Sequence, residues 1–207
     1  MMAIDFSSFT NVALLPLANF VFVASVTPGP NNLMLAASGL NFGLQRTVPH
    51  AAGVALGFLF MVLMACMGLG QLFTIFPLLQ SILTYAGSAY LLYLAYRIGT
   101  AAGVGKLESK AKPLTFIEAA LFQWINPKAW MMAVTFSSAF GLQSDNLAND
   151  AAVTLLIVLF FGVPCILIWT SFGSALRRWM KDEKHLRIFN YIMATLIVAT
   201  VPFMLMG

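Results

Sequence analysis

The sequence predicts an all-α integral membrane protein in which six transmembrane helices form one domain. Apolar residues make up 60% of the 207 residues and charged residues only 9%, whereas about a quarter of the residues of a soluble domain are charged. The apolar residues also form runs of about 20, the length of helix that crosses a bilayer core of about 30 Å. Because lipid cannot hydrogen bond to an open backbone, each run is expected to be helical.

Six apolar runs satisfy this length. They lie near residues 13–38, 51–72, 78–98, 115–141, 151–172 and 187–206. The first run is expected to be a retained helix, because no Lys or Arg precedes Arg46 and a signal peptide begins with basic residues. The runs fall into two sets of three, over about 13–98 and 115–206, joined by a loop over 99–114. We expect one membrane domain over 1–207.

Helix-breaking residues interrupt the first run within "ASVTPGPNNLML", residues 24–35. Pro28 and Pro30 cannot donate backbone hydrogen bonds and disfavour helical geometry at the residues before them, while Gly29 tolerates conformations closed to other residues. The helix is therefore predicted to end before Pro28 and to restart at about Asn31. The freed peptide groups must face protein or a polar cavity, because their exposure to lipid is costly.

A similar layout occurs 99 residues downstream, in the fourth run. There the stretch "QWINPKAWMMA", residues 123–133, aligns Pro127 with Pro28. Each interrupted run opens a set of three spans, and three is an odd number, so the second set is predicted to cross the bilayer inverted relative to the first. Inverted repeats with broken helices at equivalent positions indicate a transporter binding site near the midplane.

The two breaks offer groups that suit a zwitterion, because a half-helix N-terminus attracts a carboxylate and exposed carbonyl groups attract an ammonium group. The residues predicted to bind such a solute are Thr27, Pro28, Gly29, Pro30, Asn31, Asn32, Gln123, Asn126, Pro127 and Lys128. Lys128 has two alternatives: it lines the pathway, or it caps carbonyls or reaches an interface as a structural cation. A small neutral amino acid is favoured over a cationic one, because Glu118 is the only intramembrane carboxylate expected.

No obvious proton carrier is present in the predicted spans. Glu118 is expected near the cytoplasmic end of the fourth run, where anchoring a helix N-terminus is favoured over proton carriage. His50, at the entrance to the second run, has an imidazole suited to a proton relay, but a lone His at a loop edge is more often an interface residue. Both residues are weak candidates for proton coupling.

The basic residues predict the orientation of the six spans. Ten of the eleven Lys and Arg residues fall in loops on one side of the membrane, and Lys128 is the remaining one. Basic residues favour the cytoplasmic side in short loops, so both termini are expected outside the cytoplasm. The net charge of +4 is thus a topology signal. Nucleic-acid binding is not expected, because the basic loops are short and include Glu108, Asp182 and Glu183.

Four motifs follow one another along the chain: "TPGPNN" from Thr27, "AGVALGF" from Ala52, "YLLYLAYRIG" from Tyr90 and "NPKAW" from Asn126. Together they resemble the LysE/RhtB (lysine exporter/homoserine-threonine resistance) family of amino-acid efflux proteins. The doubled asparagine and the end of the third run look most similar to the branch that exports cysteine and O-acetylserine. The resemblance implies export of amino acids or their derivatives from the inner membrane of a bacterium, driven by the proton gradient.

Other functional classes have less support from the residues. An intramembrane enzyme needs a nucleophile with a base or a set of metal ligands, and the predicted spans contain no paired carboxylates and no HExxH. Cys66 and Cys165 lack metal-ligand spacing, so no metal, cofactor or disulfide is expected. A small-solute channel and an exporter of a metabolite other than an amino acid stay open as alternatives. A channel needs polar groups along a whole pore, whereas here they cluster at two breaks.

Small and aromatic residues predict how the helices pack and where they meet the membrane surface. Gly53 and Gly57 form a GxxxG pattern, which predicts close helix packing within one chain or between two, so a homodimer is an open alternative. Aromatic residues near the span ends predict an interfacial belt. These are Tyr93, Tyr96, Trp169 and Trp179.

Overall fold

The computed structural model describes residues 11–101, 112–138, 147–180 and 182–206. Within these ranges the chain forms helices and turns, without a strand, so the prediction of an all-helical protein is confirmed. The elements are α1 (Asn11–Val26), α2 (Pro30–Phe42), α3 (Leu44–Cys66), the 3-10 turn η1 (Leu69–Gln71), α4 (Leu72–Ile75), α5 (Pro77–Gly99), α6 (Phe116–Ile125), α7 (Pro127–Ser138), α8 (Leu147–Ile157), the π-helix η2 (Val158–Gly162), α9 (Val163–Trp179) and α10 (Glu183–Met206).

Four helical stretches in the described residues are long and apolar enough to cross a membrane. They are Leu44–Cys66, Pro77–Gly99, Leu147–Trp179 and Glu183–Met206. They coincide with the predicted second, third, fifth and sixth runs. The second begins seven residues before the predicted run at 51–72, because a helix continues through polar residues such as Arg46 once it has left the hydrocarbon.

The first and fourth predicted runs are each divided into two shorter helices. Helix α1 ends at Val26 and α2 begins at Pro30, while α6 ends at Ile125 and α7 begins at Pro127. In both pairs a proline takes the first position of the second half-helix, where its missing N–H group would have no helical acceptor. The predicted breaks are therefore present at the predicted residues. The inverted relation between the two sets of spans stays a prediction.

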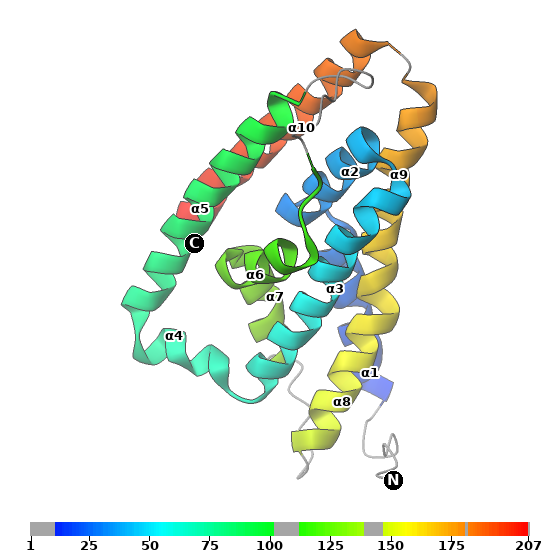
Figure 1. The fold of residues 1–207 in the computed structure, drawn as a ribbon. Coiled ribbons are helices and arrows are strands. Elements are labelled where there is room, and N and C mark those ends of the chain that lie inside the picture. The colour runs from blue at the N-terminus through cyan, green and yellow to red at the C-terminus, as the bar shows by residue number, and fades with distance from the viewer. Residues whose placement is uncertain (1–10, 102–111, 139–146, 181, 207) are drawn as a thin grey trace.

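The helices form two groups with the broken pair α6 and α7 between them. Helices α5 and α10 lie side by side at one edge of the molecule, whereas α1, α2, α3, α8 and α9 make up the opposite part (Figure 1). One apolar core joins the groups through side chains such as Leu35, Leu91 and Ile197. A second core, around Met61 and Phe136, packs α3 and α7 against α1. These cores hold the two breaks in place.

Glycines bring several helix pairs into close contact. A Cβ on Gly173 of α9 would meet the backbone oxygen of Ala36 in α2, and one on Gly57 would lie 2.7 Å from Cα of Ala120 in α6. Gly53, the other member of the GxxxG pattern, also lies against α6, where an added Cβ would meet the backbone oxygen of Phe116. The pattern therefore serves packing within the chain. A homodimer stays an untested prediction.

The described basic residues of the helix ends lie at one end of the molecule. Arg46 follows the α2–α3 turn, Arg97 lies in the last turn of α5, and Arg177 and Arg178 lie in the last turn of α9. The α9–α10 turn and the ends of α2 and α5 lie at the same end of the molecule, opposite α4 (Figure 1). Lys106, Lys110 and Lys181 lie outside the described residues.

Candidate functional site at the junction of two broken helices

The first break lies between α1 and α2. Helix α1 ends with the amide of Thr27 on the carbonyl of Val23 (3.1 Å), and α2 restarts with the amide of Leu33 on the carbonyl of Gly29 (3.0 Å). The carbonyls between these points lose their helical donors, because the helix is interrupted there and Pro28 and Pro30 have no N–H group. The sequence predicted that such carbonyls would be open to a ligand.

That prediction needs a correction, because side chains occupy the freed carbonyls. Asn32 Nδ2 donates to the carbonyls of Ser25 (2.7 Å) and Thr27 (2.9 Å). Trp169 Nε1, from α9, donates to the carbonyl of Val26 (3.1 Å). The cause is the cost of a buried carbonyl without a partner, which favours any donor that the fold can bring within reach.

Lys128, from the second break, supplies the remaining donors. Its ammonium group Nζ lies 3.2 Å from the carbonyl oxygen of Thr27, 3.1 Å from Oγ1 of Thr27 and 3.3 Å from the carbonyl oxygen of Pro28. Within the described residues no carboxylate pairs with it. This is the carbonyl-capping geometry, one of the two alternatives that the sequence left open, and it places the two breaks in direct contact.

A pair of amide side chains makes a second link between the breaks. Asn31 Nδ2 donates to Gln123 Oε1 (2.8 Å), and Gln123 Nε2 donates back to Asn31 Oδ1 (3.3 Å). Gln123 also donates to the carbonyl of Ala119 (2.8 Å), one turn earlier in α6. The polar side chains predicted from the two motifs therefore come together, although 92 residues separate Asn31 from Gln123.

Both restarting helices leave amide groups without an acceptor inside the helix. In α2 these are the amides of Asn31 and Asn32, because the first helical bond is made by the next residue. In α7 they are the amides of Lys128 and Ala129, because the first helical bond runs from Trp130 to Asn126 (3.2 Å). The N-terminal end of a helix carries a partial positive charge, so this junction is suited to a negatively charged group.

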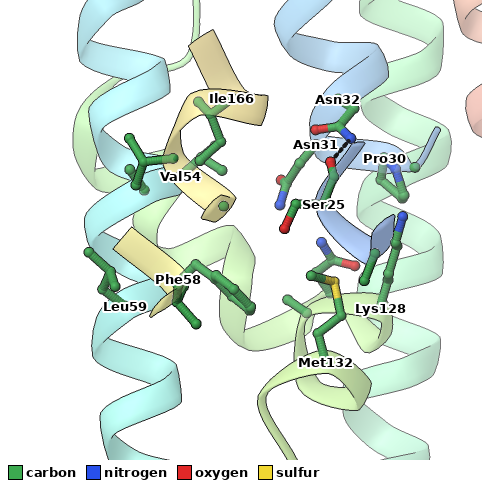
Figure 2. A pocket seen from close by; sticks show the side chains of 18 residues that line it. Ser25, Pro30, Asn31, Asn32, Val54, Phe58, Leu59, Lys128, Met132 and Ile166 are labelled. Atoms are coloured by element: carbon green, nitrogen blue, oxygen red, sulfur yellow. Dashed lines mark hydrogen bonds between the residues drawn. The ribbon is translucent and has the colours of Figure 1, made fainter. Parts of the chain in front are cut away.

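An inner pocket of about 60 Å³ lies beside this junction. Its polar side consists of Ser25, Asn31, Asn32, Asn126 and Lys128, and its apolar side includes Val54, Phe58, Met132 and Ile166. Figure 2 shows Val54 and Phe58 from α3, together with Ile166, across the pocket from Ser25 and Asn31. The described lining contains no carboxylate, so the charge of Lys128 and the two helix N-termini makes the pocket electropositive.

Asn126 carries a polar atom that the protein leaves without a partner. Its side chain is only 2% exposed and lines the inner pocket, and Oδ1 has no hydrogen-bond partner among the described residues. Buried polar atoms are nearly always paired, so an orphan is typical of a ligand site. Because Oδ1 is an acceptor, it suits a donor such as an ammonium group.

The predicted site residues divide between this pocket and a second cavity on its other side. The inner pocket is lined by Gly29, Pro30, Asn31, Asn32, Asn126 and Lys128. The second cavity, of about 620 Å³, includes Pro28 and Pro127 in its wall, and we call it the outer cavity. Thr27 and Gln123 hold the junction together through the hydrogen bonds described above. The structure brings all ten predicted residues to one region.

Neither candidate for proton coupling lines the inner pocket. Glu118 forms a capping box with Thr115, whose amide donates to its carboxylate (2.7 Å) and whose hydroxyl accepts from its amide (3.2 Å). The anchoring role favoured for Glu118 is thus present. His50 was predicted to lie at an interface, and that is wrong: it is 1% exposed inside α3, and neither ring nitrogen has a partner among the described residues. The helix begins at Leu44, which moves His50 away from a loop edge.

Sequence reasoning missed several contributors to the site. Trp169 was assigned to an interfacial belt, yet its indole binds the first break. Val54 and Ile166 line the pocket without any sequence signal, because residues facing lipid and residues facing a cavity are both apolar here. Ser25 also lines the pocket, and its small polar side chain was not singled out. The π-helix η2 also borders the pocket and follows no recognisable pattern, although π-helical turns are frequent at functional sites.

A model of the LysE type translocator family matches residues 22–206, which include both breaks and the whole lining of the pocket. The chain belongs to the LysE type translocator family. A cysteine/O-acetylserine efflux protein of Shigella flexneri serotype 5b is 30% identical over 193 residues, covering 91% of this chain and 95% of the relative. A protein of the same description from Escherichia coli K12 is 31% identical over 183 residues, covering 86% and 90%. No solved structure matches the chain.

Membership of this translocator family agrees with the apolar helices of the structure. The chain is thus a multi-pass membrane protein of a transporter family, and amino-acid efflux is the activity named for its relatives.

Proposed function

We propose that this chain is a secondary active exporter of small neutral amino acids or their derivatives, with cysteine and O-acetylserine as the first substrates to test. One observation carries the proposal: two broken helices meet at an electropositive pocket that holds an unpaired acceptor, Asn126 Oδ1. The electropositive helix ends suit the carboxylate of an amino acid, and the unpaired acceptor suits its ammonium group. The names of the relatives support the substrate class.

The substrate carboxylate would lie against the open amides of α2 and α7 and the ammonium group of Lys128, where the helix ends favour negative charge. The substrate ammonium would donate to Asn126 Oδ1. Its side chain would face Val54, Phe58 and Ile166, a wall that suits a short uncharged group such as a thiol or an acetyl ester. A cationic side chain would lack a counter-ion in the described lining.

The finer architecture belongs to this proposal. The two broken pairs would open two inverted repeats, so that each half contributes one half-helix N-terminus to the binding site. The basic end of the molecule would lie in the cytoplasm of a bacterium, with both termini on the other side of its inner membrane. Binding and release would then alternate between the two sides, without any catalysis.

Export would be driven by the proton gradient, and His50 is the first residue to examine as the proton carrier. Its imidazole is buried, and neither ring nitrogen has a partner within the described residues. His50→Gln should abolish the dependence of export on an imposed pH gradient. If the gradient dependence survived in both His50→Gln and Glu118→Gln, another group would carry the proton.

Reconstitution into proteoliposomes tests the function directly. Labelled cysteine or O-acetylserine should accumulate when a pH gradient is imposed, and Asn31→Leu should abolish the flux without preventing membrane insertion. A large ohmic current would instead show a small-solute channel. Flux of a metabolite other than an amino acid, with none of an amino acid, would show an exporter of a different substrate class.

A further inference from the structure

The outer cavity adjoins the proposed binding site, and most of its wall takes no part in that site. It measures about 620 Å³ and lies among η1, α4, α5, α7 and α10. Its wall is apolar in part, through Phe73 and Phe203, but it also carries polar side chains from three elements. These are Thr74, Gln80, Thr84 and Thr200. Hydroxyl and amide groups on several helices are unfavourable against lipid and suit a water-filled space.

The outer cavity and the inner pocket share a wall. Three residues line both: Gly29, Pro30 and Lys128. The lysine side chain lies directly across the Gly29 backbone, because a Cβ at that position would be 2.9 Å from its Cδ and its Nζ. Its three oxygen partners hold it there. The partition between the two spaces therefore includes one flexible side chain.

The charge of Lys128 makes this partition responsive to a solute. Its three partners are neutral oxygens, and within the described residues it has no carboxylate partner. A carboxylate adds charge–charge attraction to the hydrogen bond, which a neutral carbonyl or hydroxyl oxygen does not supply. An arriving carboxylate would thus draw the ammonium group away from the carbonyls of Thr27 and Pro28, and the ammonium group of the same solute could take its place on them.

We propose that the outer cavity is the vestibule through which the exported solute leaves, and that the Lys128 side chain is the gate between this vestibule and the inner pocket. The proposal rests on the proposed export function. It agrees with the position of the cavity, whose wall comes in part from η1 and α4, opposite the end that carries the basic residues (Figure 1).

Cysteine accessibility tests the vestibule and the gate separately. In a background with Cys66→Ala and Cys165→Ala, single cysteines replace Thr84 in the vestibule and Ser25 in the inner pocket. A charged thiol reagent that does not cross membranes is added to whole cells, and the rate of labelling is measured. We expect labelling at position 84 and protection at position 25. Absence of labelling at position 84, or labelling only from the cytoplasmic side, would overturn the vestibule.

Removal of the gate should expose the inner pocket. With Lys128→Ala or Lys128→Met, labelling at position 25 should rise by about tenfold or more, because the charge-assisted hydrogen bonds that hold the gate closed are lost. Met131→Ala is the matched control, because Met131 lies in the vestibule wall one helical turn after Lys128. This variant should leave position 25 protected. Unchanged labelling at position 25 in both lysine variants would overturn the gate.

Two readouts keep this test independent of folding and of transport. Labelling at position 84 in each lysine variant shows that the variant is inserted and folded, and Lys128→Met retains most of the aliphatic side chain if Lys128→Ala does not insert. Labelling needs no substrate flux. A protein that shows the expected labelling but moves no amino acid in proteoliposomes would therefore refute the proposed function and not the gated path.

Discussion

At the scale of single residues, the junction separates groups that hold the fold from groups left for a solute. The carbonyls of Ser25 and Val26 are occupied by Asn32 and Trp169, so they stabilise the break itself. Asn126 Oδ1 has no such partner. Carbonyl oxygens at the same junction therefore have different roles, and substitution distinguishes them.

Asn126→Ala should weaken substrate binding with little change in stability. The substitution removes an acceptor that has no partner among the described residues, so folding loses no bond there. A bound ammonium would lose one hydrogen bond, and we expect the apparent affinity to fall about tenfold. Concentration-dependent uptake and thermal unfolding of the purified protein measure the two effects.

Asn41→Ala is the control for this prediction. Asn41 and Asn190 exchange two hydrogen bonds (2.8 and 3.0 Å) away from the pocket, and both are buried. Loss of one partner leaves the other unsatisfied, which should cost about 1–3 kcal/mol of stability. Transport per folded molecule should stay the same. Equal effects of Asn41→Ala and Asn126→Ala on substrate affinity would argue against a binding role for Asn126.

Gly29→Ala tests a single position at the gate. The backbone there is extended (φ −172°) and accepts any residue, so the constraint is space. The added methyl group would meet only the flexible end of Lys128, which can move at little cost. We expect normal membrane insertion together with impaired export. Normal export kinetics in Gly29→Ala would show that the position of Lys128 does not matter.

At the scale of helices, close backbone contacts fix the walls of the pocket. Helices α2 and α9 approach each other through Gly39 and Gly173, where an added Cβ would meet a backbone oxygen of the opposite helix. Backbone cannot yield as a side chain can, so these contacts set the distance between the first break and the helix that carries Trp169.

Gly173→Ala should therefore destabilise the whole protein. The added Cβ would meet the backbone oxygen of Ala36, and separation of the helices should cost about 1–3 kcal/mol as for other overpacked cores. Gly99→Ala is the control, because its nearest contact would be an ordinary 3.4 Å from Ala194. Thermal unfolding in detergent should show a lower midpoint for Gly173→Ala alone. Equal midpoints for the two variants would contradict this assignment.

At the scale of the molecule, the clustering of basic residues at one end predicts the orientation in the membrane. Lys184 is exposed at this end, in the first turn of α10, and Gln71 is exposed in η1 at the opposite end. Basic residues near the ends of membrane helices favour the cytoplasmic side. The end that carries Lys184 should therefore face the cytoplasm, and the end that carries Gln71 should face the other side of the membrane.

Single cysteines at these two positions check the orientation. Gln71→Cys should react with an impermeant thiol reagent in intact cells, and Lys184→Cys should react only after the membrane is permeabilised. The reverse pattern would place the basic end outside the cytoplasm and the outer cavity on the cytoplasmic side.

The sequence by itself determined where the two helices break, and it identified the residues that meet there. Proline has no N–H group, so Pro28, Pro30 and Pro127 act through their own backbone wherever they occur. Only the tertiary structure decided that Lys128 binds the carbonyls of Thr27 and Pro28, that Trp169 points inward and that His50 is buried. In a membrane protein apolar residues face both lipid and the interior, so hydrophobic periodicity does not show which side of a helix is inside.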